Sequence, residues 1–148
     1  MIQRIQSLFL LIVLLLSILL NFIPVFEYNK PVGEDLISGS PETIRYFISQ
    51  KTVLFVLNIA ISSLALFTIF LYKKRNLQIR LTGLSLLLTS IMIFLLFFLA
   101  DSYRTDFDNN LKYLYGTYCP IVQLVLSYLA QRAIRKDEEL VRSADRLR

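Results

Sequence analysis

The chain has 148 residues, 55% of them hydrophobic, and its mean hydropathy of +0.58 is too high for a soluble domain of this length. It carries a formal charge of +5, a single cysteine and no histidine. The lone Cys119 excludes an internal disulfide and a multi-cysteine metal site, and the lack of histidine excludes His-ligated zinc, His-ligated haem and a His general base. The apolar residues lie in long runs, so the sequence predicts an integral membrane protein.

The first apolar run extends from Leu8 to Phe26 and follows a short stretch with one cation, Arg4. A signal peptide is the alternative, but the run exceeds a typical hydrophobic region of 7–15 residues, and no A-x-A-like cleavage site follows it. We therefore expect a retained first span over about residues 5–26, entering the membrane from the cytoplasm.

The longest polar segment is Glu27–Lys51. Its Pro and Gly at residues 31–33 indicate a turn. Ser40, Pro41 and Glu42 are typical of a helix start, and Ile44, Phe47 and Ile48 follow at helical spacing. These features predict either a short amphipathic helix on the membrane surface or a simple extension of the second span.

A basic joint, Tyr72–Arg80, separates two apolar runs that are each about as long as a helix needs to cross a membrane. We expect spans at about residues 52–72 and 77–99, packed as an antiparallel hairpin because the connection is short. Short loops rich in Lys and Arg stay in the cytoplasm, which places this joint inside.

The remainder of the chain comprises an expected acidic loop, Asp101–Lys112, a fourth span at about residues 113–131, and a charged cytoplasmic tail at 132–148 with helical character. Asp106, Asp108 and Asn110 have the spacing of the first calcium ligands of an EF-hand loop. However, Leu111 and Thr117 occupy the positions that require Gly and a bidentate Glu, so we expect a solvated loop and no metal site.

The distribution of Lys and Arg between the two sides of the membrane tests this topology. Eleven lie on the side assigned to the cytoplasm and five on the other. The eleven are Arg4, Lys73, Lys74, Arg75, Arg80, Arg132, Arg135, Lys136, Arg142, Arg146 and Arg148, and the five are Lys30, Arg45, Lys51, Arg104 and Lys112. This bias predicts that both termini are cytoplasmic. Because the cations flank the spans and do not form a basic stripe with interleaved aromatics, we expect no nucleic-acid binding.

Four polar residues, Ser17, Asn21, Asn58 and Gln123, lie within the predicted spans, and apart from Arg80 near the start of the third span no Asp, Glu, Lys, Arg or His occurs there. We expect Asn21 and Asn58 at similar depth near the outer surface, in contact with each other or with another polar group, since lipid does not tolerate an unpaired amide. Such side chains form interhelical hydrogen bonds, and the alternative is a polar pathway for a solute.

Three stretches carry a family resemblance: Met1–Ser7, Tyr72–Arg80 and the ending Arg132–Arg148. Together they resemble a family of small four-helix membrane proteins from Bacteroidota, known as domain of unknown function forty-two ninety-three. The resemblance covers the whole chain, and the C-terminal stretch is its most specific part. It implies a bacterial inner-membrane location and four spans, and it supplies no activity or functional residues.

The sequence thus predicts an all-α integral membrane protein with four transmembrane helices and a C-terminal helix that extends into the cytoplasm. We expect no enzymatic activity and no catalytic, cofactor or metal site. The first functional hypothesis is a component that assembles with itself or with a protein partner through a weak apolar stripe on the tail, which includes Leu140, Val141 and Leu147. The alternatives are a small transporter or channel lined by the Asn, Gln and Ser groups, and an enzyme acting on lipid through Asp101, Asp106 or Asp108.

Overall fold

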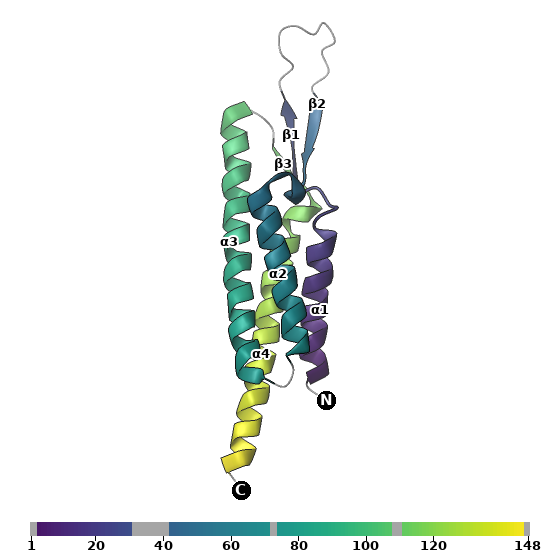
Figure 1. Cartoon of the computed structure of the whole chain (residues 1–148). Coiled ribbons are helices and arrows are strands. Elements are labelled where there is room, and N and C mark those ends of the chain that lie inside the picture. Colours follow the sequence, from purple (N-terminus) through teal and green to yellow (C-terminus); the bar gives the residue numbers. More distant parts are fainter. Residues whose placement is uncertain (1–2, 31–41, 72–73, 108–110, 147–148) are drawn as a thin grey trace, which may run out of the picture.

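Four long helices form the body of the molecule in the computed structural model, which describes residues 3–30, 42–71, 74–107 and 111–146 (Figure 1). Each helix packs against two others, α1 against α2 and α4, and α3 against α2 and α4. The described helices are α1 (Gln3–Leu19), α2 (Thr52–Phe70), α3 (Arg75–Phe107) and α4 (Cys119–Arg146). The helical fold predicted from the apolar runs is confirmed.

Helices α2 and α3 form the predicted antiparallel hairpin. Near the joint, the Gln78 side chain donates a hydrogen bond to the Thr68 carbonyl oxygen at 2.9 Å. Helix α3 begins at Arg75, so it includes much of the basic joint. Among the described residues, α2 and Arg75–Arg104 are long and apolar enough to cross a membrane, with mean hydropathies of 2.4 and 2.5, whereas the apolar part of α1, Ile5–Leu19, is shorter.

A small sheet caps the end of the bundle opposite the termini (Figure 1). Its strands are β1 (Phe26–Lys30), β2 (Glu42–Tyr46) and β3 (Lys112–Tyr113), in the order β2-β1-β3 and paired antiparallel. Two 3-10 turns, Ile48–Gln50 and Tyr115–Thr117, lead from the sheet into α2 and α4.

The strand β2 contradicts the predicted amphipathic helix. Ile44 and Ile48 are four residues apart, a spacing that fits one turn of a helix and also two repeats of a strand. Burial decides between them, because Tyr46 is buried and Ile44 half-buried while Thr43 and Arg45 are exposed, which is strand alternation. The register places Arg45 opposite Glu27 of β1, an opposite-charge pair that favours this pairing.

Two further boundaries differ from the prediction. The first apolar run continues to Phe26, but α1 ends at Leu19 and Phe26 belongs to β1. The expected acidic loop is helical through Phe107, so Asp101 lies on α3, while residues 108–110 lie outside the described part. Pro24 explains why α1 does not continue to Phe26, since proline lacks the N–H that a continuing helix requires.

The non-helical segment after α1 has its backbone groups bonded within the protein. Val25 donates to the Tyr46 carbonyl oxygen at 2.8 Å and accepts from the Leu114 N–H at 2.8 Å and from the Thr117 hydroxyl at 2.5 Å. Gly116 permits this packing, because a Cβ there would lie 2.6 Å from the Pro24 carbonyl oxygen. The backbone of this irregular segment is therefore satisfied within the protein.

Candidate functional site

Ser17, Asn21 and Asn58 form one hydrogen-bonded network between α1 and α2. The Ser17 hydroxyl donates to Asn58 Oδ1 at 2.8 Å, and the Asn58 amide donates to the Ser17 carbonyl oxygen at 2.9 Å and to Asn21 Oδ1 at 3.1 Å. The Asn21 amide in turn donates to the carbonyl oxygens of Ser17 at 3.0 Å and Ile18 at 3.3 Å. The two asparagines therefore contact each other.

This network has a structural purpose that follows from where α1 ends. The last carbonyls of a helix have no partner within it. The backbone N–H of Asn21 donates to the Ile18 carbonyl oxygen, and the Ser17 carbonyl oxygen instead accepts hydrogen bonds from the two asparagine side-chain amides. Asn21 and Asn58 thus cap the end of α1, and the Asn58 side chain does so from a fully buried position.

Gln123 of α4 lies at the height of this network. Gln6 donates to the Ala133 carbonyl oxygen at 3.1 Å, which ties α1 to α4 near the end that carries the termini. Measured along the helices from that bond at 1.5 Å per residue, Ser17 lies about 16 Å away on α1 and Gln123 about 15 Å away on α4, so the two are at the same height. The bond between Gln78 and Thr68 places Thr89 of α3 level with Asn58 in the same way.

The bundle therefore contains a polar layer of one residue from each helix: Ser17, Asn58, Thr89 and Gln123. All four side chains are fully buried. Sequence reasoning identified three of them and missed Thr89. The heptad-like spacing of Thr82 and Thr89, on the α3 face that also carries Ser85, is the signal that could have found it.

The two sides of the polar layer differ in how well their polar atoms are satisfied. The Thr89 hydroxyl donates to the Ser85 carbonyl oxygen at 2.8 Å, and Asn58 uses both ends of its amide. By contrast, the side-chain amide of Gln123 and the hydroxyls of Ser85 and Ser127 have no hydrogen-bond partner among the described residues. Ser127 follows Gln123 by one helical turn, so unpaired polar atoms concentrate on the α3 and α4 side.

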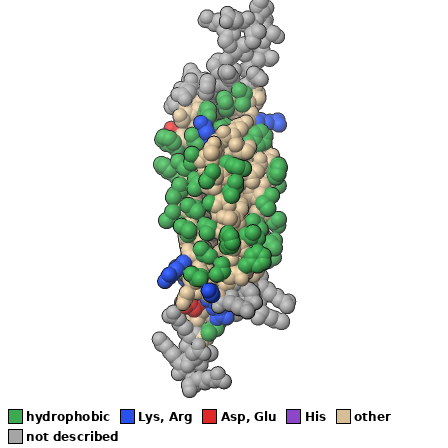
Figure 2. All heavy atoms as spheres, in the orientation of Figure 1, with side chains coloured by type: hydrophobic (Ala, Val, Ile, Leu, Met, Phe, Trp, Pro, Cys, Tyr) green, Lys and Arg blue, Asp and Glu red, His purple; other side chains and the backbone are tan. Residues whose placement is uncertain are grey.

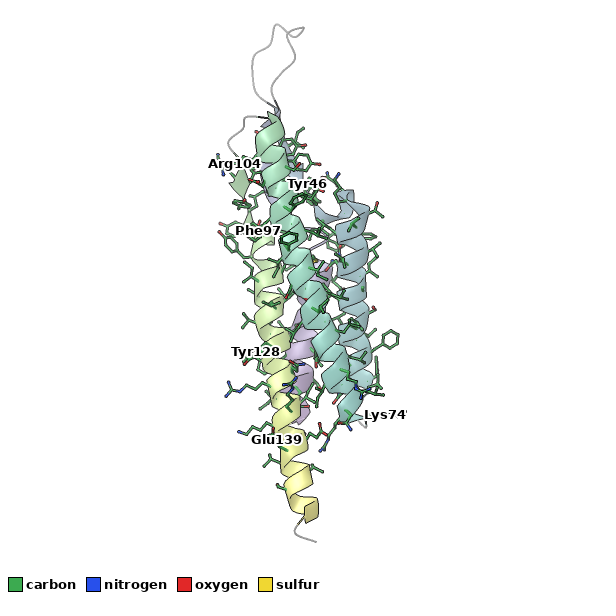
Figure 3. The ribbon with its side chains drawn as sticks, turned by 90° about the vertical axis from the view of Figure 1, so that its left-hand side faces the viewer. Tyr46, Lys74, Phe97, Arg104, Tyr128 and Glu139 are labelled. Atoms are coloured by element: carbon green, nitrogen blue, oxygen red, sulfur yellow. The ribbon has the colours of Figure 1, made fainter. Side chains whose placement is uncertain are left out.

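The sheet end holds a stacked aromatic cluster. Phe26 and Tyr46 stack at 4.4 Å between ring centroids, and Tyr28 and Tyr103 stack at 5.2 Å. Burial raises the pKa of Tyr46 well above its ordinary value of 10.0, with smaller contributions from Tyr103 and Tyr28, so its hydroxyl stays protonated. Burial also raises the pKa of Tyr28. Figure 3 shows Tyr46 and Arg104 at this end and Lys74 and Glu139 at the opposite end.

At that opposite end, α4 continues beyond the other helices (Figure 1). Leu140 and Val141 are exposed on this extension, at 49% and 41%, while Ile134 above them is buried in the bundle. Leu147, the third predicted docking residue, lies outside the described residues.

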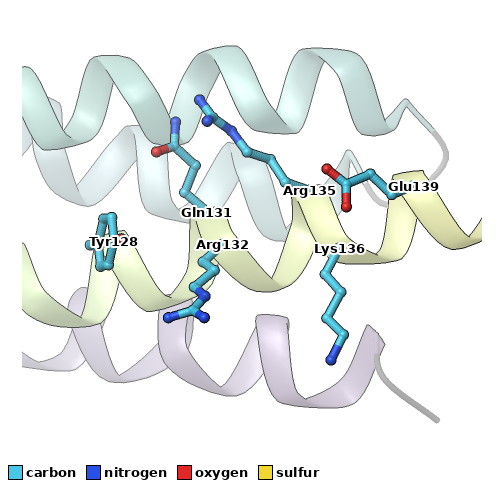
Figure 4. A pocket seen from close by; sticks show the side chains of 6 residues that line it. All are labelled: Tyr128, Gln131, Arg132, Arg135, Lys136 and Glu139. Atoms are coloured by element: carbon cyan, nitrogen blue, oxygen red, sulfur yellow. The ribbon is translucent and has the colours of Figure 1, made fainter.

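The outward face of α4 also bears a basic groove that sequence reasoning missed. It has a volume of about 480 Å³ and is lined by Tyr128, Gln131, Arg132, Arg135, Lys136 and Glu139 (Figure 4). The recurrence of Tyr128, Arg132 and Lys136 at four-residue intervals is the signal that could have revealed it. Within the described part of the chain, no three His, Cys, Asp or Glu residues are grouped so that they could hold a metal ion.

A family model described as Domain of unknown function (DUF4293) matches residues 2–147 of the chain. A comparison with curated proteins finds no match.

Proposed function

The chain belongs to the DUF4293 family, and on that premise we propose that it is a four-span bacterial inner-membrane protein without enzymatic activity. It serves as an assembly component and docks a protein partner on the cytoplasmic extension of α4. The single observation that carries the docking is the exposure of Leu140 and Val141 on a helix that has left the bundle.

The distribution of polar and apolar side chains supports four spans. Every helix exposes large apolar side chains, as at Leu15 on α1, Phe67 on α2, Phe94 on α3 and Val125 on α4. Buried positions, in contrast, include the polar layer. Figure 2 shows apolar side chains over the middle of the molecule, with cations at both ends. A soluble bundle has the opposite arrangement, because water favours polar groups outside.

Charge and geometry support a cytoplasmic location for both termini. The N- and C-terminal ends lie at the same end of the bundle, as an even number of crossings requires (Figure 1). Lys74, Arg75 and Arg80 lie at that end together with the cations of the basic groove. The positive-inside rule assigns this more basic end to the cytoplasm.

The end of α4 supports docking. The amide of Asn76, when oriented as a donor, lies 2.7 Å from Glu138 Oε1, so α3 still contacts α4 at this level. Beyond it, Leu140 and Val141 are adjacent and exposed, in a stretch too polar to insert into a bilayer. A protein partner with an apolar contact would remove both side chains from water at a gain of about 1.5–3 kcal/mol for each fully buried.

Site-specific photo-cross-linking in cells tests this docking. A photo-reactive residue at Ser143, which is exposed one turn beyond, should give one discrete adduct. The double variant Leu140→Ser and Val141→Ser should abolish the adduct while membrane insertion is unchanged, because every charge stays in place. Lys51→Gln, at the other end of the molecule, is the control and should leave the adduct intact. Persistence of the adduct in the double variant would refute docking through these residues, and an adduct of twice the chain mass would identify self-association.

A second candidate is a pathway for a small polar solute, and the unpaired amide of Gln123 is the observation that favours it. The saturated bonds of Ser17, Asn21 and Asn58 count against it, since groups already paired do not bind a solute. Gln123→Met separates the two functions. A pathway predicts normal folding with loss of function in cells, whereas a docking component should retain its function.

A further inference from the structure

The basic groove on α4 lies where the apolar face of the helix ends. Val122, Val125 and Leu129 are exposed along α4 at helical spacing, and they lead directly to Tyr128 and then to Arg132. A molecule with an apolar chain and an anionic head would match both the apolar face of α4 and the basic groove that follows it. A soluble anion would match only the groove itself.

The groove carries a net positive charge. Arg132, Arg135 and Lys136 lie within little more than one helical turn, about 6 Å at 1.5 Å per residue, and Glu139 is the only carboxylate among the lining residues. Figure 4 shows Gln131 and Arg135 directed toward α3, and Arg132 and Lys136 directed toward α1, so the charges surround the groove.

These side chains suit a phosphate diester. Guanidinium groups bind phosphate oxygens through paired hydrogen bonds, while a lysine ammonium contributes a point charge. Tyr128 stands at the apolar margin of the groove, the position that tyrosines favour at the level of lipid headgroups. The volume of about 480 Å³ accommodates one headgroup.

We propose that the basic groove binds the phosphate of one acidic phospholipid of the cytoplasmic leaflet, whose acyl chains lie along Val122, Val125 and Leu129. This inference rests on the membrane placement proposed above and is independent of docking at Leu140 and Val141. It distinguishes the groove from the other cations at this end, Lys74 and Arg80, which do not line it.

Native mass spectrometry of the full chain released from detergent micelles tests the proposal. With added phosphatidylglycerol we expect one bound lipid per chain, and with phosphatidylethanolamine a much smaller bound fraction. Arg132→Gln combined with Lys136→Gln should weaken phosphatidylglycerol binding by about fivefold for each cation removed. The matched control, Lys74→Gln with Arg80→Gln, removes the same charge and should change binding less than twofold. Arg132→Lys keeps the charge but loses the paired hydrogen bonds, so it should weaken binding less than Arg132→Gln alone.

Three results would overturn the proposal: equal binding of the two lipids, equal losses in the two double variants, or a loss in Arg132→Lys as large as that in Arg132→Gln. Displacement of phosphatidylglycerol by a hundredfold excess of inorganic phosphate would show a site for free phosphate in place of a lipid site. If the chain were not embedded in membranes, it would remain monodisperse without detergent and bind neither lipid, which distinguishes failure of the membrane placement from failure of the groove.

Discussion

Asn58 and Gln123 form a natural pair for measuring what the polar layer contributes to stability. Both side chains are fully buried amides at the same height in the bundle. Asn58 accepts one hydrogen bond from Ser17 and donates two, to Ser17 and Asn21, whereas the Gln123 amide has no partner among the described residues. Asn58→Leu and Gln123→Met each replace an amide with an apolar group of similar volume.

The structure gives different magnitudes for the two substitutions. Interhelical hydrogen bonds within membranes contribute about 0.6 kcal/mol each on average, so losing three lowers the free energy of unfolding by about 2 kcal/mol in Asn58→Leu. Gln123→Met breaks no bond and removes a buried unpaired amide, so the free energy of unfolding should be unchanged or increased. Loss of the Asn58 amide also leaves the end of α1 with one capping side chain, Asn21.

Equilibrium unfolding in mixed detergent micelles, followed by far-ultraviolet circular dichroism, measures both values. Ser90→Ala provides the control, because Ser90 is exposed and bonds only within its own helix. A loss of stability in Gln123→Met as large as that in Asn58→Leu would refute the stabilising effect assigned to the Asn58 hydrogen bonds. An unchanged free energy of unfolding in Asn58→Leu would likewise show that the network does not hold α1 against α2.

Three further predictions concern the sheet end and the threading. Gly116→Ala should cost about 1–3 kcal/mol of stability in a thermal unfolding assay, because the added Cβ would lie 2.6 Å from the Pro24 carbonyl oxygen; unchanged stability would contradict this packing. Tyr46→Phe should leave stability at neutral pH unchanged or higher. Since the folded pKa of Tyr46 is raised, wild-type stability should fall as the pH rises above 10.0, and the variant should lose less; identical alkaline curves would disprove the assignment. In a Cys119→Ala background, an impermeant thiol reagent should label Ser38→Cys but not Asn76→Cys in intact spheroplasts, and the reverse pattern would invert the threading.

The helix hairpin and the polar contacts show what reasoning from sequence can reach. The length of the apolar runs and the short connection between them predict α2, α3 and their antiparallel packing, because both depend on local properties of the chain. The similar depth of Asn21 and Asn58 predicts that each has a polar partner, and in the structure the Asn58 side-chain nitrogen lies 3.1 Å from Asn21 Oδ1. Their second role, capping the end of α1, cannot be predicted from the sequence, since it depends on where that helix ends.

The small sheet, in contrast, could not be predicted from the local sequence. The spacing of Ile44 and Ile48 fits a helix and a strand equally well, and only the pairing of Glu42–Tyr46 with β1 selects a strand for Ile44, while Ile48 begins the 3-10 turn that follows.

The sequence alone determined that this chain forms apolar helices and that its basic joint turns the chain back, because hydrophobic length and local charge act on each segment separately. The tertiary structure decided which polar groups meet, where α1 ends, and that three cations of α4 surround one groove. Those features depend on the relative height and rotation of helices, which are set by side-chain packing between segments far apart along the chain.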